Sequence, residues 1–204
     1  MKIRFIVILL FALHVSAFYG QKKTVDDIEI EILKVKEPSS FSNELLRGIK
    51  FDQEKFKYVM VKCKVNSLKE NRTQISAFSL VDTVNKIRYR LGDYLGYGAI
   101  IGNPERNYFR KTKSNNKTSN YNTPQFRANE IDLFDKYKFE GYTPFEIPVE
   151  FGTKKNPDQS IIYFGQTAYK NFKAELFFII PLELKNDSFI LYYKDSKIGT
   201  AKLK

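Results

Sequence analysis

The sequence has few of the residues that carry most hydrolytic, metal and thiol chemistry. Its 204 residues contain no tryptophan, one cysteine and one histidine, His14. One cysteine cannot form a disulfide within the chain, and one histidine cannot supply the ligands of a usual zinc site. His14 also lies in a segment that a signal peptidase would remove. Without it, no Ser-His-Asp triad or Cys-His pair can form. We therefore expect no bound metal or cofactor.

Residues 1–17 have the three parts of a secretory signal peptide. Two basic residues precede a short apolar run, and Val15–Ala17 places small residues at the positions that a signal peptidase reads. This pattern predicts a cut before Phe18, with a cut before Gln21 as the alternative. The apolar run is shorter than the roughly 20 residues that cross a bilayer, so we expect no transmembrane segment. The sequence thus predicts a secreted or periplasmic protein; a buried strand or a membrane anchor is the competing interpretation.

Basic residues outnumber acidic ones. The formal net charge is +11, and it falls to +9 when Lys2 and Arg4 are removed with the signal peptide. An excess of this size keeps an exported protein soluble and attracts polyanions. Two interpretations stay open: a generally lysine-rich composition, or contact with an anionic polymer or an anionic membrane surface.

The lone cysteine, Cys63, lies in a stretch with the alternation of a strand. Val61, Cys63 and Val65 share one face, and Lys62 and Lys64 point the other way. A reactive thiolate needs a positive partner on its own face, whereas a small thiol among valines packs as an apolar residue. The pattern predicts that Cys63 is a core residue.

Alternating apolar and polar residues predict an all-β fold. In residues 25–35, apolar and acidic side chains alternate, as in a strand with one buried and one wet face. Residues 129–139 are ambiguous, because their apolar residues have helical spacing. About nine strands at hairpin spacing, without βαβ alternation, predict one sandwich or barrel domain over residues 18–204. The expected strands are residues 25–35, 56–65, 73–81, 86–91, 142–151, 160–164, 172–182, 188–193 and 198–203.

A long exposed loop is expected over about residues 92–130. It begins with several glycines and continues into a stretch rich in Asn, Lys, Thr and Ser. Residues 111–123 contain no aliphatic side chain, so they cannot bury enough surface to order themselves.

Two groups of residues resemble a known family. The first is 57–66 (KYVMVKCKVN), followed by 77–82 (AFSLVD) and 87–90 (IRYR); the second is 174–181 (AELFFIIP), followed by 189–193 (FILYY) and 198–200 (IGT). They are similar to strand and turn motifs of secreted bacterial immunoglobulin-like domains of unknown function, whose fold is similar to that of a small secreted mycobacterial antigen. The resemblance implies an immunoglobulin-like antiparallel β-sandwich, here with a long polar insertion. It carries no catalytic residues.

The loop is also the best candidate for a binding site. Its basic residues are interleaved with aromatic ones, and cations capture phosphate, sulfate or carboxylate groups while rings stack on bases or sugars. The candidate anion-binding residues are Arg106, Arg110, Lys111, Lys113, Lys117 and Arg127. An anionic polysaccharide or another polyanion would fit them, and the absence of a base-reading motif argues against sequence-specific nucleic-acid recognition. A solvated insertion is the competing interpretation, because the same composition is typical of disorder.

The sequence gives little support for a catalytic function. No phosphate-binding glycine motif or calcium loop is present. Glu146 and Glu150 are expected on one face of the strand 142–151, and a carboxylate pair can hydrolyse glycosides; period-two alternation, however, places glutamates outward on any such strand. Asp132 and Asp135 are expected on a solvated face. We therefore predict a non-catalytic secreted or envelope-associated binding module, with a carboxylate-based hydrolase as the alternative.

Overall fold

The computed structural model of the 204-residue chain describes residues 21–38, 49–98, 104–105, 110–112, 131–152, 155 and 157–203. Residues 1–17 and most of 92–130 lie outside this part. The described elements, in chain order, are β1 (Lys22–Val25), β2 (Ile28–Lys36), β3 (Ile49–Lys50), β4 (Phe56–Ser67), η2 (Ile75–Ala77), β5 (Phe78–Asp82), β6 (Ile87–Tyr97), β7 (Pro104–Glu105), β8 (Arg110–Thr112), α3 (Leu133–Lys136), β9 (Thr143–Phe145), β10 (Val149–Gly152), β11 (Pro157–Ser160), β12 (Ile162–Phe164), β13 (Asn171–Pro181), β14 (Ser188–Tyr193) and β15 (Ser196–Lys202).

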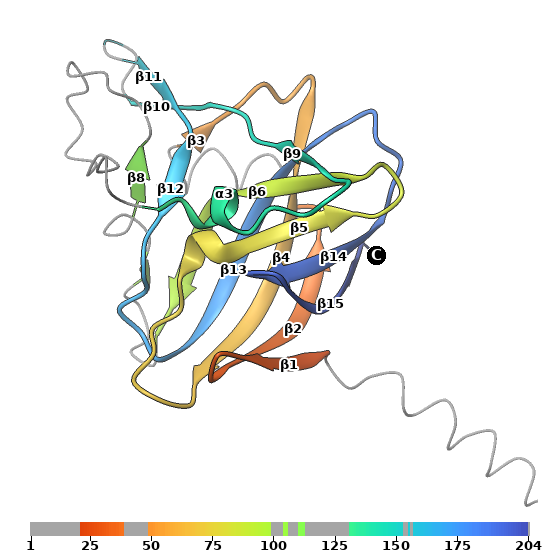
Figure 1. Cartoon of the computed structure of the whole chain (residues 1–204). Helices are drawn as coiled ribbons and strands as arrows, with labels where there is room; N and C mark the ends of the chain where they lie inside the picture. Colours follow the sequence, from red (N-terminus) through yellow and green to blue (C-terminus); the bar gives the residue numbers. More distant parts are fainter. Residues whose placement is uncertain are drawn as a thin grey trace, which may run out of the picture.

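The fold is all-β, as the sequence predicts, and its main sheet is nearly barrel-shaped (Figure 1). The strand order is β1-β2-β4-β13-β6-β5-β14-β15, and each of these neighbours is antiparallel. β15, at one end of this order, contacts β1 and β2 at the other end. Two smaller sheets, β11-β10-β3 and β12-β8, lie beside the main one.

Strand β6 connects the two halves of the main sheet. Its first residues, 87–90, pair with β5, and residues 91–97 pair with β13. Within the part that pairs with β13, Asp93 lies opposite Phe177 and Leu91 lies opposite Phe178. Gly92 is therefore the extra residue of a β-bulge. A Cβ on Gly92 would lie 2.9 Å from the Ile179 side chain. The bulge bends β6, and glycine allows β13 to approach it.

The interior of the sheet is apolar and includes the cysteine. Val61, Cys63 and Val65 of β4 have no exposed surface, which confirms that Cys63 is a core residue. Its burial raises the pKa of the thiol far above the ordinary value. Cys63 is therefore protonated and packs as a small apolar side chain.

Two predicted strands have different boundaries in the structure. Residues 25–35 were expected to form one strand, but the chain reverses at Asp26 and Asp27, which have φ of 49° and 62°. Aspartate tolerates this left-handed region, and the result is the β1–β2 hairpin. Likewise, 73–81 was expected to be a strand, but residues 75–77 form the 3-10 helix η2 and the strand begins at Phe78.

Two other predicted strands also differ in extent from those in the structure. The predicted strand 86–91 continues to Tyr97, because β13 supplies hydrogen-bond partners along 91–97. The predicted strand 142–151 is interrupted, and its two parts, β9 and β10, belong to different sheets. Pro148 lies at the interruption, where a missing N–H costs no ladder hydrogen bond. The ambiguous segment 129–139 contains the short helix α3.

The segment 131–147, which contains α3 and β9, runs along β6; we call it the strap. β9 pairs in parallel with the first half of β6, with Phe145 opposite Tyr89. Figure 1 shows α3 in front of β6 and β5. The strap buries Phe134, which is 1% exposed. Its acidic residues are thereby placed against the polar side chains of β6.

Candidate functional site

The structure gives the backbone position of two of the candidate anion-binding residues. Arg110 and Lys111 belong to β8, which pairs with β12, so that Lys111 lies opposite Tyr163 and Arg110 opposite Phe164. The other candidates, Arg106, Lys113, Lys117 and Arg127, lie outside the described residues. The start of the basic segment is thus joined to the side of the main sheet by a short antiparallel ladder.

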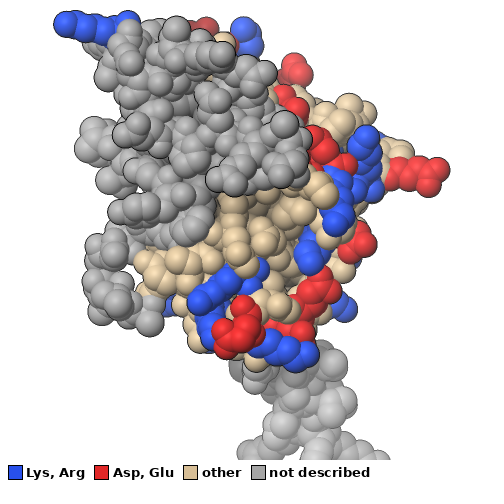
Figure 2. Space-filling model, turned by 60° about the vertical axis from the view of Figure 1, so that its left-hand side comes forward, with Lys and Arg blue, Asp and Glu red and all other residues tan. Residues whose placement is uncertain are grey.

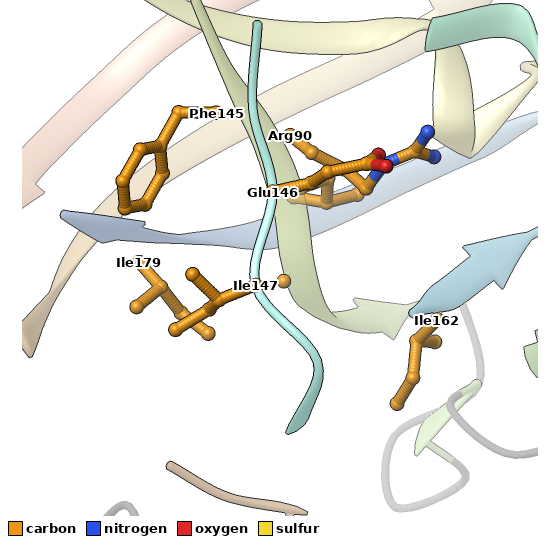
Figure 3. A pocket seen from close by; sticks show the side chains of 8 residues that line it. Arg90, Phe145, Glu146, Ile147, Ile162 and Ile179 are labelled. Atoms are coloured by element: carbon orange, nitrogen blue, oxygen red, sulfur yellow. The ribbon is translucent and has the colours of Figure 1, made fainter. Parts of the chain in front are cut away.

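A small surface hollow lies beside β12, where β6 separates from β13 (Figure 3). It has room for about one water molecule. Figure 3 shows the Glu146 carboxylate beside the Arg90 guanidinium, with the apolar side chains of Phe145, Ile147 and Ile179 nearby. The lining residues are Arg90, Leu91, Gly92, Phe145, Glu146, Ile147, Ile162 and Ile179. A hollow of this size does not accommodate a sugar or nucleotide ring.

Arg90 is the centre of the polar network that holds the strap. It donates through Nη1 and Nη2 to both carboxylate oxygens of Asp132, at 3.0 and 2.6 Å, and through Nε to Glu146. Asp135 lies 3.6 Å from Nη2. Asp132 also accepts a hydrogen bond from the N–H of Phe134, which caps the start of α3. One guanidinium therefore organises the acids of the strap.

Arg88, two residues earlier on the same face of β6, is also buried. It donates through Nε to Ser79 at 3.0 Å and through Nη1 to the carbonyl oxygen of Phe134 at 2.6 Å. Its guanidinium lies 4.2 Å from the centre of the Phe134 ring and that of Arg90 lies 4.5 Å from it. Phe139 contacts Arg88 as well, at 4.6 Å. Both arginines are thus in cation–π contact with the Phe134 ring.

This environment shifts the pKa values of the two guanidinium groups in opposite directions. Burial, and secondarily the charge of Arg90, lower the pKa of Arg88 to about 10, against the opposing effect of Asp135 and Asp132. Burial also acts to lower the pKa of Arg90, but hydrogen bonds and charges from Asp132 and Glu146 outweigh it, so that this pKa is raised. Both side chains are cations at neutral pH, and the acids of the strap compensate them.

Glu146 and Glu150 do not lie on one strand as expected. Glu146 follows β9 and is an ion-pair partner of Arg90, whereas Glu150 is an exposed residue of β10. The carboxyl groups of Asp52, Glu70 and Asp82 have lowered pKa values, whereas the general acid of a glycosidase has a raised one.

The sequence interpretation missed the network around Arg90. Asp135 is exposed, as expected of a solvated face, but Asp132 is 7% exposed and buried against Arg90. The available signal was the pair Arg88 and Arg90, which alternation places on one face of a strand. The strap adds several acidic and aromatic residues to that signal. This signal indicates a structural ion pair more directly than a reaction.

Charges of both signs are mixed over the described surface. Figure 2 shows Lys and Arg side chains interspersed with Asp and Glu on one such face. Several lysines are in ion pairs, among them Lys62 with Glu175 at 3.0 Å and Lys22 with Glu29 at 2.8 Å. The described strands therefore present a compensated surface, unlike residues 106–127, whose charges are all positive.

No family model, curated protein or solved structure matches this chain. In the described ranges, no three His, Cys, Asp or Glu side chains are grouped as metal ligands would be. The helices found there are also too short or too polar to cross a membrane.

Proposed function

We propose that the chain is a secreted or periplasmic, non-catalytic binding module that contacts an anionic polymer through residues 106–127. A sulfated or carboxylated polysaccharide is the class of ligand that best fits the segment. The contact is made by Lys and Arg side chains with the anionic groups, and the neighbouring aromatic residues pack against sugar rings.

The observation that carries this proposal is the charge of the segment. Residues 106–127 contain six basic residues and no acidic residue. The described strands, in contrast, mix both signs and pair several of their lysines. A polyanion therefore meets the strongest positive field at this segment, and a loop on a rigid β scaffold is a common place for binding residues.

The non-catalytic part of the proposal is supported by how the acids of the strap are used. The carboxylate of Asp132 accepts hydrogen bonds from the buried Arg90 guanidinium and from the N–H of Phe134. Glu146 is held by the same arginine. Both carboxylates are thus engaged by a buried cation that belongs to the scaffold, which suits a structural role and not a general acid.

For the fold, we propose that the nearly barrel-shaped sheet is an immunoglobulin-like sandwich. In this interpretation, β1, β2, β4 and β13 with the end of β6 form one layer, and the start of β6 with β5, β14 and β15 forms the other. The change of pairing partner along β6 at the Gly92 bulge supports it, because strands that switch sheets do so at bulges.

The proposed contact is tested by retention of the exported protein on heparin at low salt. One variant replaces Arg106, Arg110, Lys111 and Lys113 with serine. The matched control replaces four lysines that are exposed on β2, β4 and β13 in the same way: Lys34, Lys36, Lys64 and Lys173. Both variants lose the same charge, so they separate a local contact from attraction by the net charge.

We expect the wild type and the control to elute at similar salt concentrations, with the 106–113 variant much earlier. Equal elution of the two variants would show that net charge alone causes retention, and the binding segment would then be a solvated insertion.

A further inference from the structure

Three aromatic residues of the strap and of β14 pack together outside the ion-pair network. Phe139 of the strap lies 4.6 Å from Tyr192 of β14 and 6.2 Å from Tyr142, measured between ring centres. Both contacts are edge-to-face, with angles of 71° and 86° between the ring planes. Figure 1 shows the strap in front of β5, the strand between β6 and β14. We call Phe139, Tyr142 and Tyr192 the ring cluster.

The ring cluster is held in place by the sheet beneath it. The Arg88 guanidinium, itself hydrogen-bonded to Ser79, lies 4.6 Å from the centre of the Phe139 ring. Tyr192 lies opposite Ser79 in the pairing of β14 with β5. All three aromatic residues are half-buried, so each is fixed by its neighbours and keeps part of its surface open to solvent. Rings that are already fixed lose little conformational freedom when a ligand packs on them.

Two lysines flank the ring cluster. The Nζ atom of Lys86 lies 5.3 Å from the centre of the Tyr142 ring, and the carbonyl oxygen of Lys86 accepts a hydrogen bond from the N–H of Thr143. Lys197 of β15 lies directly opposite Tyr192, and opposite residues of an antiparallel pair share one face of the sheet. Both lysines are exposed. Among the described residues, neither forms an ion pair.

The strap also repeats the residue pattern of the candidate binding segment. Residues 136–142 (KYKFEGY) contain two lysines, three aromatic residues and one acid, Glu140. This mixture suits an anionic sugar. The face of an aromatic ring is electron-rich and packs against the C–H groups of a sugar ring, while a tyrosine hydroxyl stays available for hydrogen bonds. An ammonium group binds sulfate or carboxylate.

We infer that the ring cluster, with Lys86 and Lys197, is a subsite for one sugar residue of an anionic polysaccharide. Tyr142 and Tyr192 pack against the sugar ring, and the two lysines bind its sulfate or carboxylate groups. The inference rests on the proposed function, because it takes the same class of ligand. A polysaccharide that reaches both this subsite and residues 106–127 is held at two points, which raises its affinity above that of either contact alone.

The test is calorimetric titration of the exported protein with a defined heparin oligosaccharide over a range of NaCl concentrations. The ring variant combines Tyr142→Leu and Tyr192→Leu, which keep apolar side chains but remove the rings. The lysine variant combines Lys86→Gln and Lys197→Gln. Its matched control combines Lys64→Gln and Lys173→Gln, which remove the same charge from exposed positions on β4 and β13.

The two variants should differ in how salt affects binding. We expect the ring variant to bind about tenfold more weakly at every salt concentration, with an unchanged slope of log K against log salt, because stacking releases no counterions. We expect the lysine variant to have a slope reduced by about 2, and its control to keep the wild-type slope. If the ring variant has a lowered thermal midpoint, the lysine variant decides, since both lysines are exposed.

The other outcomes separate this inference from the proposed function. Wild-type affinity and slope in both the ring and the lysine variants would overturn the inference, and weakened binding by the 106–113 serine variant would leave the proposed function standing. Equal losses in the lysine variant and its control would also overturn the inference, because net charge would then be the cause. A wild-type protein that does not bind the oligosaccharide would overturn both.

Discussion

Arg90 and Asp132 form a bidentate ion pair that joins β6 to the strap. The two nitrogen–oxygen distances are 3.0 and 2.6 Å, and the two side chains are 6% and 5% exposed. The residues are 42 positions apart in the sequence. Because both charges are withdrawn from water, each depends on the other, and the pair holds the strap on the sheet.

Removing one partner of this ion pair should therefore destabilise the folded protein. We expect Asp132→Ala to lower the free energy of unfolding by about 3–5 kcal/mol, because it leaves the Arg90 guanidinium buried with half of its compensation. Asp135→Ala is the matched control. Asp135 is exposed and lies 3.6 Å from the same guanidinium, so its loss should cost about 1 kcal/mol or less. Urea unfolding measures both, and equal effects would contradict the role given to the bidentate pair.

The Phe134 ring should contribute both burial and cation–π contact. Phe134→Leu keeps an apolar side chain between the strap and β6 but removes the ring that both arginines contact. We expect it to cost about 1–2 kcal/mol beyond the loss of apolar area. Phe134→Ala also leaves a cavity and should cost about 3–5 kcal/mol. If thermal unfolding placed the leucine variant level with the wild type, the ring contacts would have no energetic role.

Asp82 should make stability depend on pH. It accepts hydrogen bonds from the N–H groups of Val84 and Asn85, each at 2.9 Å, and from the Asn85 side chain. Burial acts to raise the pKa of Asp82, but these hydrogen bonds outweigh it and leave the pKa lowered. The charged form is thus stabilised in the folded state. The stabilisation is complete above the ordinary aspartate pKa and is lost as pH falls through the lower folded value.

Asp82→Ala tests this effect. At pH 7 it should cost about 1–3 kcal/mol, because two backbone N–H groups lose hydrogen bonds to a buried, charged carboxylate. The gap between the variant and the wild type in urea unfolding should narrow below about pH 4. A gap that stayed constant down to pH 2 would mean that the charge of Asp82 contributes nothing.

Much of the fold could be predicted from local patterns. Strand β14 has the bounds that alternation predicted, 188–193, and Cys63 lies in the core among the valines that share its face. These cases depend only on which residues share a face of a strand. The continuation of β6 past Gly92 could not be predicted in this way, because a glycine usually marks a break and the pairing with β13 is a long-range contact.

The polar network was also beyond local patterns. Asp132 lies near a helix start, where acids are usual on a solvated surface, and only the distant Arg90 makes its burial favourable. The interruption between β9 and β10 has a similar cause, because Glu146 is directed to Arg90 instead of continuing a strand. An ion pair between residues far apart in sequence leaves no periodic signal.

The central claim, that residues 106–127 bind an anionic polymer, is tested most directly by the salt dependence of affinity for a defined heparin oligosaccharide. Calorimetric titrations over a range of NaCl concentrations would compare the wild type, the 106–113 serine variant and the variant with four serines on the strands. Each lost contact with an anionic group should reduce the slope of log K against log salt by about 1. We expect a steep slope for the wild type and the strand variant, and a slope reduced by several units for the 106–113 variant. The same slope for all three proteins would contradict the claim.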